Sequence, residues 1–231
     1  MRAYLPAYDL KVPANLAQAL DWLARDPEDW SVLAGGTDLM VLLEAGNLSV
    51  GRFLSVWHLP ELKGIAETRE YITLGSLTTF TEMQQSAILQ DKYPLLCQAG
   101  SETGAVAIQN RATLGGNIAN ASPAADSPPA LLVYDAELEL ISASSGRRWL
   151  PYSAFHTGYK QTLLQPGELI SSIRLPRSPT HWKQGYRKVG RRRAQAISKI
   201  CFAGRMQIRG GLIEDIRIAF GSVAPIPLRC T

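Results

Sequence analysis

The sequence predicts an α+β fold of two subdomains followed by a short C-terminal region, and three observations support this prediction. Residues 1–55 contain the order strand, glycine turn, helix and strand, which is typical of a small β-α-β unit. Residues 56–176 contain short strand patterns with helical patterns between them. Residues 177–231 include two apolar-rich segments around Gly210 and Gly211, which is a strong hairpin signal.

The first region opens with a helix pattern. In NLAQALDWLAR apolar side chains recur at helical spacing, with Asn15 as N-cap and Gln18 three residues later. After it, SVL predicts a strand, AGGT a turn, DLMVLLEAG a second helix and RFLSVWHL a second strand. This order predicts an α/β subdomain over residues 1–55.

The middle region mixes strands and helices. YITLGSLTTF alternates like a strand, and Thr79 with Glu82 fits a capping box. Pro94 opens a predicted helix in PLLCQAGSE. The segments ELELISA and ELISSIRLP are predicted strands, each flanked by glycine or proline. An α+β subdomain is therefore expected over residues 56–176.

Length and composition limit the class of protein. The 231 residues are 46% hydrophobic and 19% charged, which suits a globular chain with a core of its own. No apolar run approaches the roughly 20 residues that span a bilayer, and the first residues lack the pattern of a secretory signal. The cysteines Cys97, Cys201 and Cys230 form no metal-ligand spacing and favour a reducing compartment. We therefore expect a cytoplasmic protein with no metal site and no membrane partner.

The positive charge of the chain is concentrated in one run. Net charge is +4, and much of the excess lies in RKVGRRRAQ, residues 187–195. Such a run can bind nucleic acid, but this one has no flanking aromatic platform and no recognition-helix pattern. A solvated loop or a docking surface is the favoured alternative, so no nucleic-acid partner is expected.

The first candidate site is the glycine turn in VLAGGTDL. A strand delivers the chain to Gly35 and Gly36, and Thr37 with Asp38 opens a helix. Glycines permit close backbone approach and positive φ, while free amides at a helix start favour a phosphate. The pattern is neither G-x-G-x-x-G nor a Walker loop. The alternative is a tight turn with Thr37 or Asp38 as a helix N-cap.

The second candidate is ATLGGNIANASPAADSPPALL. Thr113, Gly115, Gly116 and Asn117 offer backbone amides and two polar side chains, and Asp126 is an acceptor for hydroxyl or amide-like groups. The alternative is an irregular loop in which Asp126 caps the following helix. Two such turns in one chain suit a long ligand with a diphosphate in its middle.

These motifs resemble those of a known family. LAGGTDL followed by ATLGGNIANASPAAD is similar to the FAD-binding medium subunit of the molybdenum hydroxylases, the xanthine dehydrogenase and carbon monoxide dehydrogenase family. LLQPGELISSIRLP, KQGYRKVGRRRAQAISKICFA and IRIAFGSVAPIPLR follow in the family's order. The resemblance covers nearly the whole chain, and the paired glycine motifs are more specific than either motif alone.

The resemblance implies a vanillyl-alcohol-oxidase-like, PCMH-type FAD-binding fold. Residues 1–176 would form the FAD-binding domain and residues 177–231 a C-terminal α/β subdomain. The first turn would hold the diphosphate, Ile170 would pack near the flavin ring, and Thr103 or Gly104 stands where some relatives place a ring-stacking aromatic residue. The implied FAD-binding residues are Val32, Leu33, Ala34, Gly35, Gly36, Thr37, Asp38, Leu39, Thr103, Gly104, Thr113, Leu114, Gly115, Gly116, Asn117, Asp126, Ile170 and Lys183.

The resemblance also implies an electron-transfer subunit, an FAD-dependent oxidoreductase with no catalytic acid or base of its own. Electrons would come from a molybdenum-cofactor large subunit through two 2Fe–2S clusters of a small subunit, pass to FAD and reach an acceptor such as NAD⁺. A standalone FAD-dependent oxidoreductase and a degenerate scaffold subunit are the alternatives. Because relatives continue past APIPLR, the C-terminal subdomain is expected to be incomplete.

Overall fold

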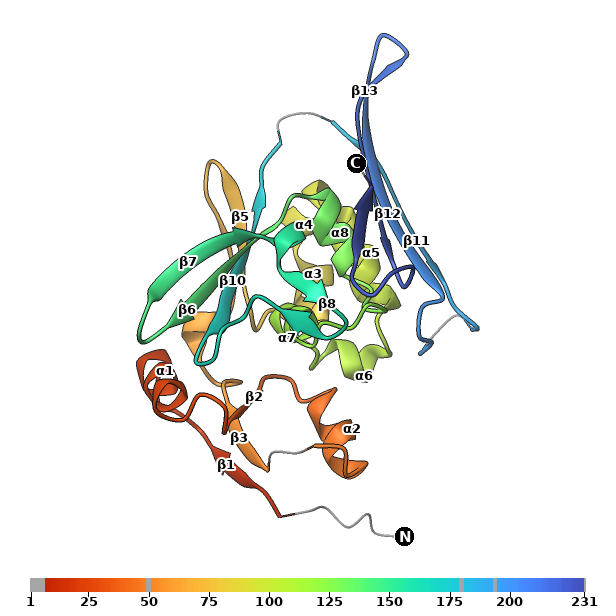
Figure 1. Ribbon diagram of the computed structural model, residues 1–231. Coiled ribbons are helices and arrows are strands. Elements are labelled where there is room, and N and C mark those ends of the chain that lie inside the picture. Colours follow the sequence, from red (N-terminus) through yellow and green to blue (C-terminus); the bar gives the residue numbers. More distant parts are fainter. Residues whose placement is uncertain (1–6, 49–50, 179–180, 193–194, 231) are drawn as a thin grey trace.

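The computed structural model describes residues 7–48, 51–178, 181–192 and 195–230. They form an N-terminal parallel sheet, a central sheet covered by helices, and a C-terminal antiparallel sheet (Figure 1). The helices lie between the central and C-terminal sheets, and the N-terminal part lies at the bottom of the view in Figure 1. In the described part of the chain, no helix is long and apolar enough to cross a membrane.

The N-terminal part contains the predicted β-α-β unit. Its sheet has the order β1-β3-β2, and both pairings are parallel. Helix α1 begins where the sequence predicts, because Asn15 accepts a hydrogen bond from the backbone N–H of Gln18 at 2.9 Å. Strand β1 is an addition that the sequence pattern does not indicate. The elements are β1 (Asp9–Lys11), α1 (Leu16–Arg25), β2 (Ser31–Leu33), α2 (Leu39–Glu44) and β3 (Arg52–Ser55).

The central sheet has the order β4-β5-β10-β6-β7, and every pairing is antiparallel. Of these five strands, β10 comes last in the chain, yet it lies in the middle of the sheet. Segments that are distant in the sequence are therefore brought side by side. The strands are β4 (Ile65–Glu67), β5 (Tyr71–Gly75), β6 (Glu137–Ser142), β7 (Gly146–Pro151) and β10 (Leu169–Pro176). Smaller elements are η1 (Pro60–Leu62), η2 (Tyr152–Ala154) and the paired strands β8 (His156–Gly158) and β9 (Gln161–Thr162).

Short helices cover one side of the central sheet (Figure 1). The predicted capping box is confirmed, since Thr79 and Glu82 each accept a hydrogen bond from the other's backbone N–H. Leu74, Phe80, Leu114 and Leu138 belong to the core cluster that joins this sheet to its helices, and each is fully buried. The helices are α3 (Phe80–Gln85), α4 (Ala87–Lys92), α5 (Pro94–Glu102), α6 (Val106–Gln109), α7 (Leu114–Ala119) and α8 (Pro128–Val133).

The C-terminal sheet has its strands in chain order, all antiparallel. Gly210 and Gly211 form the predicted hairpin turn with φ of +59° and +83°, as the favoured two-residue turn requires. The implied α/β character is not found, because the described residues from 181 onward form strands and no helix. Alternating apolar side chains at this end give the period of a strand. The strands are β11 (Lys183–Val189), β12 (Ile200–Arg209), β13 (Leu212–Gly221) and β14 (Leu228–Cys230).

Polar contacts hold the C-terminal sheet against helices α5 and α8. Asp135, just after α8, accepts hydrogen bonds from Arg217 of β13 and Arg229 of β14. Tyr134 donates from its hydroxyl to Gln184 Oε1 at 2.6 Å. The sheet therefore closes over the helical layer and brings its inner face toward the loops that precede α8.

Candidate functional site

The fold brings the two glycine turns together. An added Cβ at Gly35 would lie 1.8 Å from the carbonyl oxygen of Arg111, and one at Gly116 would lie 4.0 Å from the Cβ of Ala34. The side chain of Asn120, after α7, donates to Asp38 Oδ1 at 3.3 Å. A strand-to-helix turn of the N-terminal part thus faces the start of α7 in the central part.

The first turn leaves its backbone donors available. The N–H groups of residues 34–38 donate to no residue that the structure describes. Gly36 has a φ of +77°, a conformation that glycine adopts without strain. Asp38 stands at the N-cap of α2, which is the position that the capping alternative gives it, but its side chain makes no cap hydrogen bond. The turn therefore presents a run of donors of the kind that binds an anion.

The second turn uses its donors within the protein. The N–H of Leu114 donates to Thr78 O and that of Gly115 to Ser76 O, both at 2.9 Å. Thr113 caps α7 through its hydroxyl, which accepts the N–H of Gly116 at 3.1 Å. Neither glycine has a positive φ. Gly115 is needed because an added Cβ would lie 2.6 Å from Ser76 Cβ, whereas Gly116 is exposed beside the first turn.

Asp126 forms hydrogen bonds with residues of the C-terminal region and does not cap a helix. Its Oδ2 accepts from Lys188 Nζ at 2.8 Å and its Oδ1 from Ser198 Oγ at 2.6 Å. The capping alternative is wrong, because Ser127 occupies the N-cap of α8 and neither residue makes a side-chain cap bond there. Burial raises the pKa of Asp126, and the hydrogen bonds from Lys188 and Ser198 oppose that shift. The carboxylate and the ammonium group of Lys188 form a buried ion pair.

The loop after α5 lies beside this pair. Lys188 Nζ also donates to the carbonyl oxygen of Glu102 at 2.7 Å. Thr103 is anchored through its hydroxyl to Ala99 O at 2.8 Å, and Gly104 has a φ of +58°. The structure therefore gathers this loop and Asp126 around one lysine.

Two other predicted contacts lie in different settings. Ile170 is buried in β10, which packs against α7, and it pairs with Leu140 at the edge of a bulge that separates it from Ser172. Lys183 is exposed at the first position of β11. Strand side chains alternate between faces, so Lys183 lies on the face opposite to Lys188 and about 16 Å along the strand from it. The structure does not bring Lys183 to the glycine turns.

Two residues of this region are absent from those predicted from the sequence. Lys188 and Ser198 complete the partners of the Asp126 carboxylate. The alternation of β11 carries a signal for Lys188, because residues 184, 186 and 188 share its inner face. Lys188 is therefore not part of a solvated basic run. Two of the positions in that run, Arg193 and Ala194, lie outside the described residues.

The residues present fit an extended cofactor that carries a diphosphate. Consecutive unpaired N–H groups at residues 34–38 match the need of phosphate oxygens for donors. The exposed edge of Gly116 leaves room beside them, since the neighbour nearest to an added Cβ after the Thr113 hydroxyl is Ala34 at 4.0 Å. Residues of this kind hold and orient a cofactor, and they include no acid–base pair for chemistry of their own.

Two family models match the chain. The FAD binding domain in molybdopterin dehydrogenase matches residues 6–178, and the CO dehydrogenase flavoprotein C-terminal domain matches residues 185–231. Together they cover almost the whole sequence.

Similar proteins agree with these matches. The xanthine dehydrogenase FAD-binding subunit of Escherichia coli O157:H7 is 37% identical over 94% of this chain and 74% of its own length. The carbon monoxide dehydrogenase medium chain of Hydrogenophaga pseudoflava is 29% identical over 97% of this chain and 77% of its own length. A solved carbon monoxide dehydrogenase from the same organism superposes with a TM-score of 0.93 at 29% identity, over 98% of this chain and 78% of that chain.

Proposed function

Since this chain belongs to the FAD-binding medium subunits of the xanthine and carbon monoxide dehydrogenase family, we propose that it is the electron-transfer subunit of a molybdenum hydroxylase complex. Its cofactor is FAD, and it is an oxidoreductase subunit. In the proposed complex, electrons come from 2Fe–2S clusters of a small subunit, which receives them from a molybdenum-cofactor large subunit. They leave by way of FAD to an acceptor such as NAD⁺.

One observation supports the proposal most strongly: the unpaired backbone donors of residues 34–38 beside the start of α7. These donors would hold the diphosphate, and the neighbouring side chains of Thr37 and Asn117 would add polar contacts. Bound FAD supplies the redox chemistry, as cofactors do in such proteins. The polypeptide binds and orients it and needs no catalytic acid or base.

The flavin ring would lie farther along the second motif, beside Ile170 and the loop of Thr103 and Gly104. Neither of these loop residues is aromatic, so the ring would have no stacking partner from this loop. The Asp126–Lys188 pair lies behind the loop and would fix its position through the Lys188 bond to Glu102 O. The ring environment would therefore be set mainly by packing and by backbone groups.

An experiment on the purified complex tests the electron-transfer role. The protein is expressed with its molybdenum and iron–sulfur subunits, and FAD is removed by mild chaotrope treatment. The FAD-free complex should still oxidise substrate with an artificial dye that accepts electrons from the clusters, but it should lose reduction of NAD⁺. Added FAD should restore that activity. Full NAD⁺ reduction without FAD, or substrate oxidation by the isolated subunit, would refute the proposal.

A further inference from the structure

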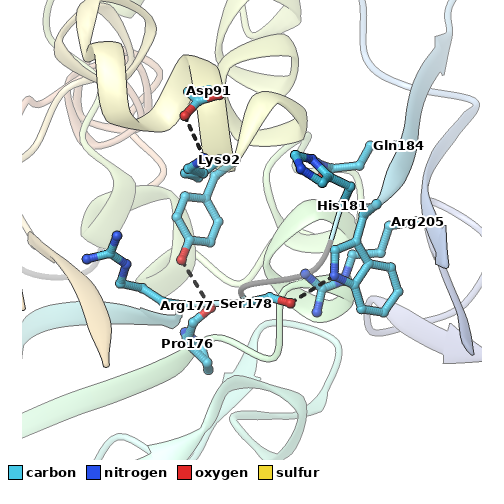
Figure 2. Close-up of a pocket in the computed structure, with 10 residues that line it drawn as sticks. Asp91, Lys92, Pro176, Arg177, Ser178, His181, Gln184 and Arg205 are labelled. Carbon is cyan, nitrogen blue, oxygen red and sulfur yellow. Dashed lines mark hydrogen bonds and ion pairs between the residues drawn. The ribbon is translucent and has the colours of Figure 1, made fainter. Parts of the chain in front are cut away.

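A second polar pocket lies at the junction of the central and C-terminal sheets. Its volume is about 150 Å³, and Figure 2 shows its lining side chains. Lys92 comes from α4, Arg177 follows β10, His181 and Trp182 precede β11, and Arg205 belongs to β12. The pocket is separate from the glycine turns, whose residues do not line it.

Arg205 is the unusual residue of this pocket. It is only 7% exposed, yet its guanidinium donates a hydrogen bond to no residue that the structure describes, and its Nε is fully buried. The side chain extends toward the middle of the pocket (Figure 2). A buried charged group without hydrogen-bond partners is costly, so such a group calls for a partner that enters from outside.

Neighbouring carboxylates do not supply that partner. The carboxylate that forms its ion pair, Asp135, lies 3.7 Å from Arg205 Nη2 and already accepts hydrogen bonds from Arg217 and Arg229. Arg205 lies over the Trp182 ring at 4.1 Å from its centroid. Contact with a ring face leaves the N–H groups of the guanidinium edge without acceptors.

The other charges of the pocket are balanced locally. Lys92 pairs with Asp91 at 2.8 Å, and Arg177 pairs with Glu67 at 2.6 Å. Among the described residues, the ion pair of Arg205 with Asp135, at 3.7 Å, is therefore longer than the pairs of Lys92 and Arg177. Burial also lowers the pKa of Arg205 to about 10, which leaves it cationic at neutral pH.

We propose that this junction pocket binds a phosphate group, with Arg205 as its anchor and Lys92, Arg177 and His181 at its walls. Arginine presents a planar fork of donors that matches two phosphate oxygens. Water molecules could accept hydrogen bonds from this fork, but they carry no negative charge to balance the guanidinium. The volume admits a small oxyanion, since it exceeds several times the roughly 30 Å³ that one liquid water occupies. The phosphate comes either from the free ion or from a nucleotide whose remainder extends out of the pocket.

The test uses the complete FAD-saturated protein in phosphate-free buffer, so that the glycine turns are occupied. Calorimetric titration with inorganic phosphate should show one saturable site, and phosphate should raise the melting temperature while the flavin spectrum stays unchanged. Arg205→Met should weaken phosphate binding by about tenfold or more, because it removes charge-assisted hydrogen bonds. Arg205→Lys should retain part of the affinity as a point charge.

Controls separate binding from a structural role. Arg209→Met removes an exposed arginine from the end of the same strand and should leave phosphate binding unchanged. Without phosphate, Arg205→Met should melt no lower than the parent, since a flexible apolar side chain replaces a buried charge that donates no hydrogen bond to the described residues. Should Arg205→Met not fold, Lys92→Gln at the half-exposed wall should weaken binding several-fold.

The titrations also identify the source of the phosphate. Displacement of phosphate by ADP, with tighter binding of ADP, would support a nucleotide, and phosphate binding that ADP does not displace would support the free ion. The proposal is overturned if the parent protein shows no saturable phosphate binding. It is equally overturned if Arg205→Met and Lys92→Gln both bind phosphate as tightly as the parent.

Discussion

The two glycine turns have similar sequences but differ in what their backbone amides do. In the first, AGGTD, the N–H groups of residues 34–38 donate to no described residue. In the second, TLGGN, the amides of residues 114–117 all donate to protein acceptors, namely Ser76, Thr78 and Thr113. The first turn therefore has backbone donors free for the proposed cofactor, whereas the second turn uses its donors to fix the start of α7.

The comparison also separates the tasks of the four glycines. Gly35 is required because it packs directly on the backbone of Arg111, and Gly115 is required because it packs directly on Ser76. Gly36 is required by its positive φ. Gly116 has ordinary backbone geometry and an edge that faces the first turn. In each pair, one glycine is needed for close packing, and the other could allow the proposed cofactor to come close to the backbone. Substitutions can distinguish these two roles.

The largest expected effect tests whether the second motif contributes stability rather than ligand contacts. Asp126→Ala leaves Lys188 as a buried, unpaired charge, so we expect a loss of about 3 to 5 kcal/mol in the free energy of unfolding. Urea unfolding of the FAD-free protein measures this loss. Asp126→Ala combined with Lys188→Met should recover part of the stability, because both charges are then absent. Unchanged stability with reduced FAD affinity would instead assign Asp126 to the cofactor.

A slightly smaller loss of stability is expected at the first turn. Gly35→Ala places a Cβ 1.8 Å from Arg111 O, so the two turns must separate, at a cost of about 3 kcal/mol. The melting temperature and the FAD content should fall together. The control is Gly185→Ala, because an added Cβ there meets no atom within 4 Å. A parent-like melting temperature for Gly35→Ala would contradict the close packing of the turns.

Gly116→Val should affect the cofactor more than the fold. The new side chain displaces the Thr113 hydroxyl, 2.8 Å from the added Cβ, and projects beside Ala34. We expect FAD affinity to fall about tenfold or more while the free energy of unfolding changes by about 1 kcal/mol. Flavin absorbance during FAD titration and urea unfolding of the FAD-free protein measure the two quantities. Full flavin occupancy in this variant would remove Gly116 from the proposed site.

The last prediction is a pH dependence that arises away from the two turns, in the η2 and β8 segment, where η2 contacts α8. His156 is buried, Tyr152 is its hydrogen-bond partner, and burial lowers the pKa of His156 to about 4. The unfolded chain takes up a proton on this histidine near pH 6.5, whereas the folded protein does not. The free energy of unfolding should therefore fall as the pH decreases from about 6.5 to about 4. Below about pH 4, His156 should cause no further decrease.

Unfolding free energies measured across this pH range test the histidine. His156→Gln should flatten the slope between pH 6.5 and 4, whereas His58→Gln, an exposed control, should leave it unchanged. An equal slope in the parent and in His156→Gln would show that other groups cause the pH dependence.

Local signals in the sequence predicted many elements correctly. The Thr79 capping box, the Asn15 cap, the Pro94 helix start and the hairpin at Gly210 are confirmed, because each depends on neighbours within four residues. The position of β10 in the middle of the central sheet was not predictable in this way. It depends on pairings with β5 and β6, which are distant in the chain.

The candidate site divides along the same line. The sequence by itself determined that the chain carries two glycine turns of this type and, through them, its resemblance to the flavin-binding medium subunits. Only the tertiary structure decided which amides stay unpaired, that Gly35 packs on Arg111, and that Asp126 pairs with Lys188. Turns and caps follow from local backbone chemistry, whereas the partners of a donor or a buried charge depend on which distant segments the fold brings together.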